Sequence, residues 1–315
     1  MPELRFDGAV IAITGAGRGM GQAYARLLGA RGARVIANDI AGAAETVALV
    51  AAAGGSAVED RGDMADPAAT EALVAGALER WGRLDAVVCN AGVYGDSLPD
   101  AEETARLLGV HLVATLNLVR SALPVFRAQG HGRIVNVGSG SMFGLPGTAV
   151  YAAGKGGVFA FTRAIAADLR RDPACDIKAN LILPAAFPPG RLVVPDAQLQ
   201  RGIEAFTPEN IAPLVALLAH PLCPAQGEAI QVGGGRHARI VLATSEGWQA
   251  PGDETSPEAI LAHWDEVMAG ADLREPAGSL ADLMVRRGLP DYSVMELAEW
   301  TRTGRDPRAR RLAGD

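Results

Sequence analysis

Tyr151 and Lys155 are the two residues whose types and spacing most clearly indicate chemistry. They lie four positions apart in Tyr151-Ala152-Ala153-Gly154-Lys155, and the chain has only one other lysine, Lys178. Residues four apart share one face of a helix, so the phenol and the ammonium would point into one site. A nearby positive charge lowers a tyrosine pKa from about 10, which suits proton exchange with a substrate oxygen. The alternative interpretation is an ordinary solvent-facing pair.

The elements that must position this pair alternate regularly up to about residue 235. Short β-branched runs typical of strands are separated by longer Ala- and Leu-rich amphipathic segments typical of helices. The predicted strands are Ala9–Ile13, Arg34–Asn38, Ser56–Glu59, Asp85–Cys89, Arg133–Val137, Ile177–Ile182 and Ala229–Val232. The predicted helices include Gly19–Ala30, Pro67–Arg80, Glu102–Ala128 and Val150–Arg171. This alternation predicts an α/β fold: a doubly wound, Rossmann-type parallel sheet of about seven strands with helices on both faces.

The alternation ends after the glycine run that closes the last predicted strand at Gly235. Residues Thr244–Thr255 have the composition of a linker, and Ser256-Pro257-Glu258 has the pattern of a helix start. We therefore predict a Rossmann-type catalytic domain over residues 1–242, followed by a linker and a C-terminal helical extension over residues 243–315.

Composition and charge exclude several classes of function. A net charge of −7 and a pI near 5.3 argue against a nucleic-acid partner. The long uncharged stretch from Ile134 to Gly154 is too rich in Gly, Ser, Asn and Pro to span a bilayer, and no leader is recognised at the N-terminus. Cys89, Cys175 and Cys223 have neither paired nor metal-ligand spacing, so we expect no metal site and a reduced, cytoplasmic protein.

A glycine-rich turn between the first strand and the first helix indicates a nucleotide site. A turn of this kind lets backbone N–H groups and a helix N-terminus meet a pyrophosphate. The predicted contacts in this turn are Gly15, Arg18, Gly19, Met20 and Gly21. Asp39 ends the second strand, where a carboxylate accepts hydrogen bonds from ribose hydroxyls and repels a 2′-phosphate, which favours NAD over NADP. Arg18 argues the other way, because it could pair with such a phosphate, and a glycine turn without a nucleotide is the structural alternative.

Five motifs in order resemble those of the short-chain dehydrogenase/reductase family, over about residues 7–235. The first is the coenzyme loop from Thr14 to Gly21. It is followed by an acid after the third strand, Asp63 with its neighbour Met64, and by the triplet Asn90-Ala91-Gly92 after the fourth strand. Ser139 follows the fifth strand, and Tyr151 with Lys155 matches the catalytic pair.

The resemblance implies specific roles for these residues. Tyr151 would be the acid/base, Lys155 would lower its pKa and bind the nicotinamide ribose, and the hydroxyl of Ser139 would orient the substrate oxygen. Asp63 and Met64 would contact adenine, Asn90, Ala91 and Gly92 would line the coenzyme site, and Pro184 would contact the coenzyme after the sixth strand. Pro184-Ala185 stands where the family usually has Pro-Gly.

Two further departures from the family pattern concern the catalytic site. His111 occupies the position of an asparagine that holds a proton-relaying water, and a histidine with a pKa near neutrality could relay protons itself. A hydrogen-bonded core histidine is the alternative. The family serine usually lies thirteen positions before the tyrosine, which is Gly138 here; we favour Ser139, and Ser141 is the competitor.

Finer features narrow the resemblance. Asn38-Asp39, Val110-His111-Leu112, Ala212-Pro213-Leu214-Val215 and the segment beyond Gly235 resemble the (3R)-hydroxyacyl-CoA dehydrogenase unit of multifunctional enzyme type 2 and related bacterial dehydrogenases of steroids or their CoA thioesters. The subgroup implies that His111 belongs to the working site. The loop and helix between Pro184 and Phe206, with Phe187, Pro188, Pro189, Leu192 and Val193, fit an apolar substrate portion or simply pack on the sheet.

We therefore expect an NAD(H)-dependent enzyme that interconverts a secondary alcohol and a ketone. Its substrate would be a small molecule, a 3-hydroxyacyl thioester or a steroid-like alcohol, and could be linked to CoA or a carrier. The alternatives are a tailoring enzyme of bacterial secondary metabolism and a catalytically impaired nucleotide-binding or interaction module. Helices around residues 104–128 and 150–170 are apolar on more than one face, and in the family they join subunits, so we expect a homodimer or homotetramer.

Overall fold

The computed structural model describes residues 3–172, 175–187, 197–253, 255–270, 273, 275 and 294–306. The chain divides into two compact units, residues 1–240 and residues 241–315. The first unit carries every residue that the sequence assigned to the site. The domain boundary after residue 242 stays a prediction.

One eight-stranded sheet forms the centre of the first unit, in the order β3-β2-β1-β4-β5-β6-β7-β8. Its strands are β1 (Val10–Thr14), β2 (Arg34–Asn38), β3 (Ser56–Asp60), β4 (Ala86–Cys89), β5 (His131–Val137), β6 (Asp176–Pro184), β7 (Ala229–Gly233) and β8 (Arg236–Ile240). β1 to β7 pair in parallel, and β8 pairs antiparallel with β7. The doubly wound α/β prediction is confirmed, with all seven predicted strands present.

β8 is the strand that the sequence prediction did not include. It forms a hairpin with β7 across Gly234 and Gly235, whose φ angles are +55° and +78°. Two central residues with positive φ are the requirement of the tight hairpin turn that matches strand twist. The Gly-Gly pair is therefore the signal that the sequence offers for this hairpin, whereas the prediction from the sequence ends the sheet there.

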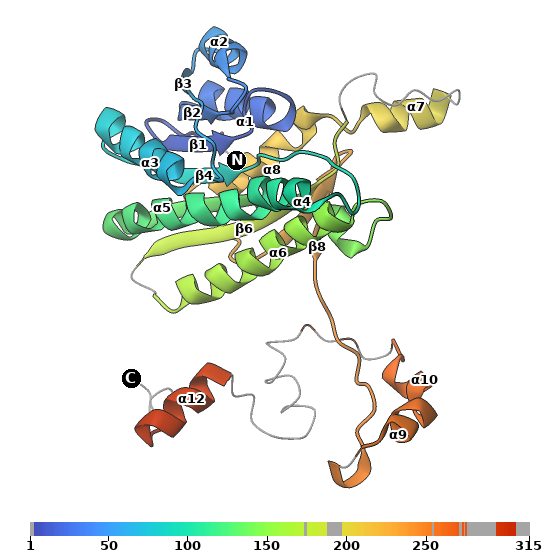
Figure 1. The fold of residues 1–315 in the computed structure, drawn as a ribbon. Coiled ribbons are helices and arrows are strands. Elements are labelled where there is room, and N and C mark those ends of the chain that lie inside the picture. Colours follow the sequence, from blue (N-terminus) through green and yellow to red (C-terminus); the bar gives the residue numbers. More distant parts are fainter. Residues whose placement is uncertain are drawn as a thin grey trace. The chain divides into compact units, whose positions relative to one another are not determined.

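Helices cover both faces of the sheet (Figure 1). On one face, α1 (Gly19–Ala30), α2 (Ala44–Ala52) and α8 (Ala212–Ala219) enclose an apolar cluster that includes Tyr24, Val50 and Leu214. On the other face, α3 (Pro67–Trp81), α5 (Ala114–Gln129) and α6 (Ala149–Arg170) enclose a second cluster. The buried strands are apolar on both sides, as a parallel sheet covered by helices requires.

The predicted helix Glu102–Ala128 is a helical run of three parts. α4 (Ala101–Leu108) and α5 are joined by a π-helical segment, Gly109–Val113, which contains His111. Single π-turns inside α-helices are frequent at functional sites. The run Ala101–Gln129 is long and apolar enough to cross a membrane by length and composition alone. Its buried side chains pack against the sheet and α3, so the fold uses it as a core helix.

Short elements complete the loops at the carboxyl ends of the strands. A 3₁₀ turn, Gly140–Phe143, follows β5, and α7 (Ala197–Glu204) follows β6. A second 3₁₀ turn, Pro208–Asn210, precedes α8. Pro188, Pro189, Leu192 and Val193, predicted to line the substrate side, lie outside the described residues.

The second unit contains short helices. They are the 3₁₀ turn Pro251–Asp253, α9 (Pro257–Ala262), α10 (Trp264–Val267) and α12 (Val294–Thr303). α9 begins as the sequence predicts, because the Ser256 side chain accepts a hydrogen bond from the Ala259 N–H. The Trp248 and His263 rings stack with centroids 4.3 Å apart.

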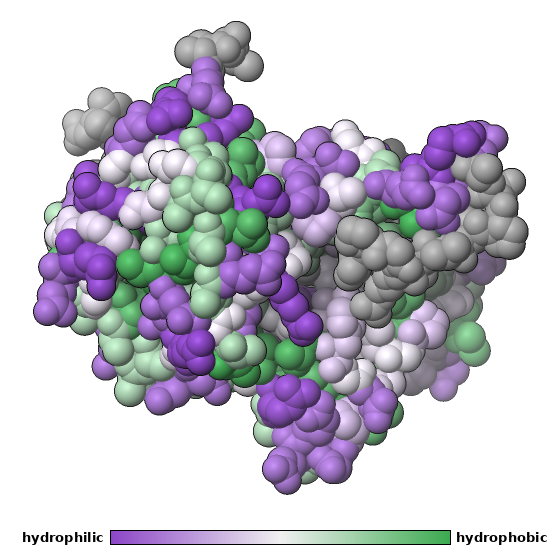
Figure 2. Space-filling model, turned by 90° about the horizontal axis from the view of Figure 1, so that it is seen from above, coloured by the Kyte–Doolittle hydropathy of each residue, from purple (hydrophilic) through white to green (hydrophobic). Residues whose placement is uncertain are grey.

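On the face of the molecule seen in Figure 2, hydrophilic and hydrophobic side chains are interspersed.

Candidate active site

The turn between β1 and α1 has the backbone that a pyrophosphate site requires. Gly15 and Gly19 have φ angles of +64° and +57°, a region that favours glycine. A Cβ on Gly21 would lie only 2.8 Å from Ala16 Cα and from Asn90 Nδ2, so the close approach of helix and turn depends on its absence. The turn opens onto the N-terminus of a twelve-residue helix. The residues present therefore fit a dinucleotide.

Asn90 joins this turn to the neighbouring strand. Its side-chain Nδ2 donates to Thr14 O at 2.9 Å and to Gly15 O at 3.1 Å. In return, Thr14 Oγ1 accepts the backbone N–H groups of Asn90 and Ala91, both at 3.0 Å. β1 and β4 lie at the point where the strand order reverses, which is where open α/β sheets bind ligands. Thr14 was not among the predicted site residues, although its place at the end of β1 indicated it.

Asp39 lies directly after β2, with its carboxylate facing the glycine turn. Asp39 Oδ2 accepts the Gly17 N–H at 3.1 Å, and Oδ1 accepts the Ala41 N–H at 3.0 Å. A Cβ on Gly17 would lie 2.8 Å from Asp39 Oδ2, so only glycine allows this approach. Arg18 occupies the N-cap position of α1; its backbone is extended and its side chain is exposed.

Asp63 and Met64 follow β3 at the same edge of the sheet. The exposed Asp63 accepts the Ala65 N–H at 2.9 Å, whereas Met64 is buried. Asn117 of α5 donates to Ala65 O at 3.0 Å and to Met64 O at 3.4 Å, which fixes this turn against the opposite helix. Asn117 is a supporting residue that the sequence analysis did not identify.

Tyr151 and Lys155 both lie on α6, as predicted, and Lys155 is the more buried of the two. The Lys155 ammonium is 3% exposed and donates to Val137 O, at the end of β5, over 2.8 Å. Burial lowers the pKa of Lys155 to about 8, while the neighbouring Cys89 raises it. Lys155 Nζ lies 5.9 Å from the centroid of the Tyr151 ring.

The pKa of Tyr151 differs from the sequence expectation. Burial, followed by Tyr94, raises the pKa of Tyr151 to about 12, although the hydrogen bond with the Ser139 side chain acts to lower it. Lys155 is not among the groups that shift the Tyr151 pKa, and its ammonium donates to the carbonyl of Val137. The phenol is therefore neutral near pH 7, which suits a proton donor.

The two candidate serines have different surroundings. Ser139 begins the 3₁₀ turn after β5, where its Oγ accepts the Ser141 N–H at 3.2 Å and interacts with Tyr151. Ser141 is buried, and its Oγ has no hydrogen-bond partner among the described residues. Of these two serines, Ser139 is therefore the one whose hydroxyl lies next to the phenol of Tyr151.

His111 packs edge-on against Tyr151, with ring centroids 4.8 Å apart and an interplanar angle of 88°. Its Nε2 lies 2.7 Å from Val93 O and 3.4 Å from Val93 N; since a carbonyl only accepts and its contact is the shorter, we assign the ring hydrogen to Nε2. Burial, followed by the Lys155 charge, lowers the pKa of His111 to about 4. The residue type alone predicts a pKa near neutrality for His111. At neutral pH the ring is instead uncharged, and its buried Nδ1 has no partner among the described residues.

Pro184 ends β6 and also lies at the carboxyl edge of the sheet. The next residue, Ala185, donates its N–H to Val232 O at 2.8 Å, so the chain stays parallel to β7 beyond the strand. The predicted site residues thus lie at or beside this edge of the sheet: those of the glycine turn, Asp39, Asp63, Met64, the Asn90 triplet, Ser139, Pro184, the pair on α6 and His111, which packs against Tyr151.

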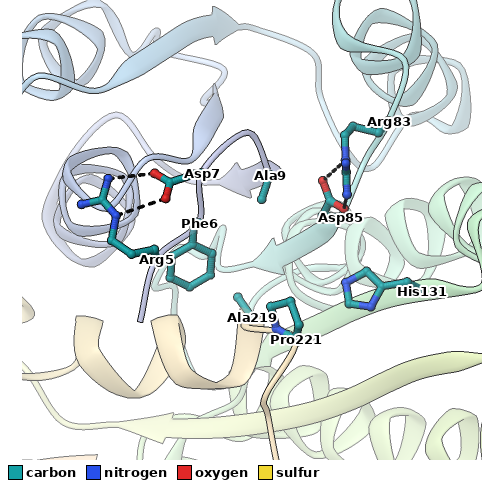
Figure 3. A pocket seen from close by; sticks show the side chains of 9 residues that line it. All are labelled: Arg5, Phe6, Asp7, Ala9, Arg83, Asp85, His131, Ala219 and Pro221. Atoms are coloured by element: carbon teal, nitrogen blue, oxygen red, sulfur yellow. Dashed lines mark hydrogen bonds and ion pairs between the residues drawn. The ribbon is translucent and has the colours of Figure 1, made fainter. Parts of the chain in front are cut away.

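A hollow of about 300 Å³ lies at the opposite edge of the sheet, near the start of the strands. Figure 3 shows its lining, in which Arg5 pairs with Asp7 and Arg83 pairs with Asp85. His131, the first residue of β5, also lines it. None of the predicted site residues is among the described residues of this lining, so it is separate from the candidate active site.

A Rossmann-type sheet, a glycine turn at its switch point and a Tyr/Lys pair define a nucleotide-dependent oxidoreductase. Residues 9–191 match the short chain dehydrogenase family. The chain belongs to this family, whose members are oxidoreductases that act on CH–OH groups with a nicotinamide cofactor, NAD or NADP.

Relatives extend over most of the chain. It is 33% identical over 295 residues to the peroxisomal hydratase-dehydrogenase-epimerase of Neurospora crassa, covering 88% of this chain and 32% of that protein. It is 33% identical to the peroxisomal multifunctional enzyme type 2 of Mus musculus, covering 87% and 38%. The chain thus spans about a third of the length of these relatives. A short-chain type dehydrogenase/reductase of Mycobacterium tuberculosis is 32% identical and covers 84% and 96%.

Solved structures give the same result. A short chain dehydrogenase from Mycobacterium avium has a TM-score of 0.71 at 30% identity, covering 84% of this chain and 97% of that one. The full-length peroxisomal multifunctional enzyme type 2 of Drosophila melanogaster has a TM-score of 0.74 at 26% identity, covering 91% of this chain and 51% of that one. The family and fold predicted from the sequence motifs are therefore confirmed.

Proposed function

We propose that this protein is an NAD(H)-dependent dehydrogenase that interconverts the secondary alcohol of a 3-hydroxyacyl thioester and the corresponding ketone. The observation that carries the proposal is the convergence of Ser139 and a buried Lys155 on Tyr151, at the sheet edge that also holds the dinucleotide turn. This edge combines a proton donor, a hydroxyl that orients an oxygen and a positive charge with the glycine turn.

The residues have distinct roles in this proposal. NAD(H), when bound, supplies the hydride acceptor or donor. Tyr151, neutral at pH 7, gives a proton to the ketone oxygen during reduction and takes it back during oxidation. Ser139 orients that oxygen through its hydroxyl. Lys155 is held by Val137 O, 5.9 Å from the centroid of the Tyr151 ring, where its ammonium would bind the nicotinamide ribose.

The preference for NAD rests on Asp39. Its carboxylate faces the glycine turn and is held by two backbone N–H groups, so it cannot turn away from a ribose without losing both hydrogen bonds. A 2′-phosphate there would meet like charge, whereas ribose hydroxyls would find an acceptor. Arg61, a cation near the same turn, is paired with Glu59 at 3.1 Å.

The substrate class is inferred from the relatives and from the surface around Tyr151. The dehydrogenase-containing multifunctional enzymes match nearly 90% of this chain, including the segment beyond the family match. Phe143, Leu145 and Phe187 follow β5 and β6 and are more than a third exposed. Apolar side chains at this edge favour a substrate with a hydrocarbon portion over a small polar alcohol.

The test is turnover of purified protein with a panel of alcohols. NADH formation is followed by absorbance with (3R)- and (3S)-3-hydroxyacyl-CoA, steroid alcohols and polyketide-like alcohols, each with NAD and with NADP. The proposal predicts the highest kcat/KM for a 3-hydroxyacyl-CoA with NAD. Turnover confined to another alcohol class would overturn the substrate, and nucleotide binding without any turnover would favour a binding module.

We also propose that the enzyme is a homodimer or homotetramer. Val113 and Leu116, at the junction of the π-helical segment and α5, are 42% and 38% exposed. Apolar residues left on the outer side of a helix that already packs on the sheet are typical of a subunit interface. Light scattering should give twice or four times the chain mass of 32.6 kDa, and a monomeric mass would contradict this proposal.

A further inference from the structure

Tyr94 is an exposed aromatic residue that lies directly over Tyr151. Its side chain is 75% exposed, yet its ring stacks on the Tyr151 ring with centroids 5.1 Å apart and an interplanar angle of 26°. The Tyr151 ring is thus bordered by His111 edge-on and by Tyr94 face-on. Of these two neighbours, His111 is buried, and Tyr94 has most of its surface available for another molecule.

The loop that carries Tyr94 is fixed on both sides of this residue. On one side, Val93 O accepts from His111 Nε2 at 2.7 Å. On the other side, Ser97 O and Ser97 Oγ accept the N–H groups of Val150 and Ala149, both at 3.1 Å, at the start of α6. The same helix begins there and carries Tyr151. The stack is therefore held by hydrogen bonds to the two elements that surround the phenol.

We propose that Tyr94 is a specificity-determining residue of the alcohol site, whose exposed ring forms the wall against which the substrate's hydrocarbon chain packs beside the reacting carbon. This inference rests on the proposed function and extends it, because it assigns the chain-length preference to one residue. A stacked, immobilised aromatic ring loses little conformational entropy on binding and offers a large apolar surface. His111, in its neutral form, acts on this wall as a positioning residue through Val93.

The proposal makes the length of the hydrocarbon chain matter more than the presence of the thioester. Substrates with a long chain cover the Tyr94 ring, whereas a four-carbon substrate reaches Tyr151 without covering it. Removal of the ring should therefore weaken long-chain substrates selectively. Removal of the phenolic hydroxyl alone should not, because the wall is the ring.

The test compares the wild type with three variants: Tyr94→Ala, Tyr94→Phe and the control Leu98→Ala. For each protein, kcat/KM and equilibrium binding are measured with 4-carbon and 16-carbon acyl-CoA probes. Leu98 is 82% exposed in the same loop. Tyr94→Ala should lower the preference for the 16-carbon probe by about tenfold, mainly through KM and Kd, while Tyr94→Phe and Leu98→Ala keep it within about twofold. Circular dichroism and NAD binding verify that each variant is folded.

The outcomes separate this inference from the proposed function. Turnover of acyl thioesters with an unchanged chain-length preference in Tyr94→Ala would overturn the inference alone. If the wild type turns over no acyl thioester, the proposed substrate fails, and binding of the two probes still decides the role of Tyr94. If the wild type binds both probes equally, or binds neither, the proposed role of Tyr94 is also overturned.

Discussion

Replacement of Lys155 by methionine should stabilise the folded protein while it removes catalysis. The ammonium is 3% exposed, and burial lowers its pKa from 10.5 to about 8. Each unit of pKa shift corresponds to about 1.4 kcal/mol, so burying the charged ammonium lowers the free energy of unfolding by roughly 3 kcal/mol. The hydrogen bond to Val137 O returns about 1 kcal/mol. The Lys155→Met variant should therefore be more stable by about 2 kcal/mol at pH 7.

The pH dependence gives the sign of this effect. Below about pH 8, Lys155 is protonated in both the folded and unfolded states, so the cost of burying the charge is fully present. Between about pH 8 and 10.5, the unfolded state binds the extra proton, and the stability of the wild type rises with pH relative to the variant. The advantage of Lys155→Met should therefore be largest at pH 7 and shrink towards pH 10.

Thermal or urea unfolding of the two proteins at pH 7 and pH 10 provides the assay. A gain of about 2 kcal/mol should raise the midpoint by about 4 °C in a chain of this size. Lys178→Met is the matched control, because Lys178 is 27% exposed and lies 3.8 Å from Asp176; it should not raise the midpoint. A Lys155→Met variant that unfolds at or below the wild-type temperature at both pH values would refute the reasoning.

Three further predictions concern cofactor and substrate binding. Asp39→Ser should reduce the preference for NAD over NADP by about tenfold or more, because the Asp39 carboxylate and a 2′-phosphate about 4 Å apart would repel by several kcal/mol at intermediate dielectric. The ratio of kcat/KM for the two cofactors measures this preference, and an unchanged ratio would contradict the prediction. Gly21→Ala should weaken NAD binding about tenfold and lower the free energy of unfolding by about 1–3 kcal/mol, since the added Cβ would lie 2.8 Å from Asn90 Nδ2. Calorimetry with NAD tests this prediction, and a wild-type affinity in the variant would argue against the turn as the dinucleotide site. Ser139→Ala should lower kcat by about 10²-fold or more, because the Ser139 hydroxyl interacts with the Tyr151 phenol. Ser141→Ala should stay within about threefold, because the Ser141 hydroxyl has no hydrogen-bond partner among the residues that the structure describes; the reverse order of the two effects would exchange their roles.

The fold was predictable because its signals are local and periodic. The central parallel strands follow from β-branched runs that are buried on both faces, whereas β3 lies at the sheet edge and has no buried residue. The helices α1 and α6 follow from amphipathic spacing. β8 was not found because Arg236, His237 and Arg239 give it no apolar run; only its Gly-Gly turn indicated a hairpin. The π-helical segment at His111 also has no signature in residue spacing, since π-turns interrupt a helix without changing its composition.

The meeting of the candidate residues at one sheet edge was predictable, whereas their electrostatics were not. Parallel strands bring their carboxyl ends to one edge, so residues that follow several strands were expected to meet there. Burial and orientation are tertiary properties, and they determine that Lys155 faces Val137 O and that the pKa of His111 falls to about 4. Tyr94 was not recognised, because an aromatic residue in a loop has no pattern of its own; its stacking on Tyr151 is visible only in three dimensions.

The most direct test of the account is the effect of Tyr151→Phe on NAD-dependent oxidation of a 3-hydroxyacyl-CoA. Loss of the phenolic hydroxyl removes the proton partner of the substrate oxygen and leaves the nucleotide turn intact. The account predicts that kcat/KM falls by about 10²–10⁴-fold while the Kd for NAD stays within about threefold of the wild type. A Tyr151→Phe enzyme that retains activity within tenfold of the wild type would contradict the assignment of Tyr151 as the acid/base.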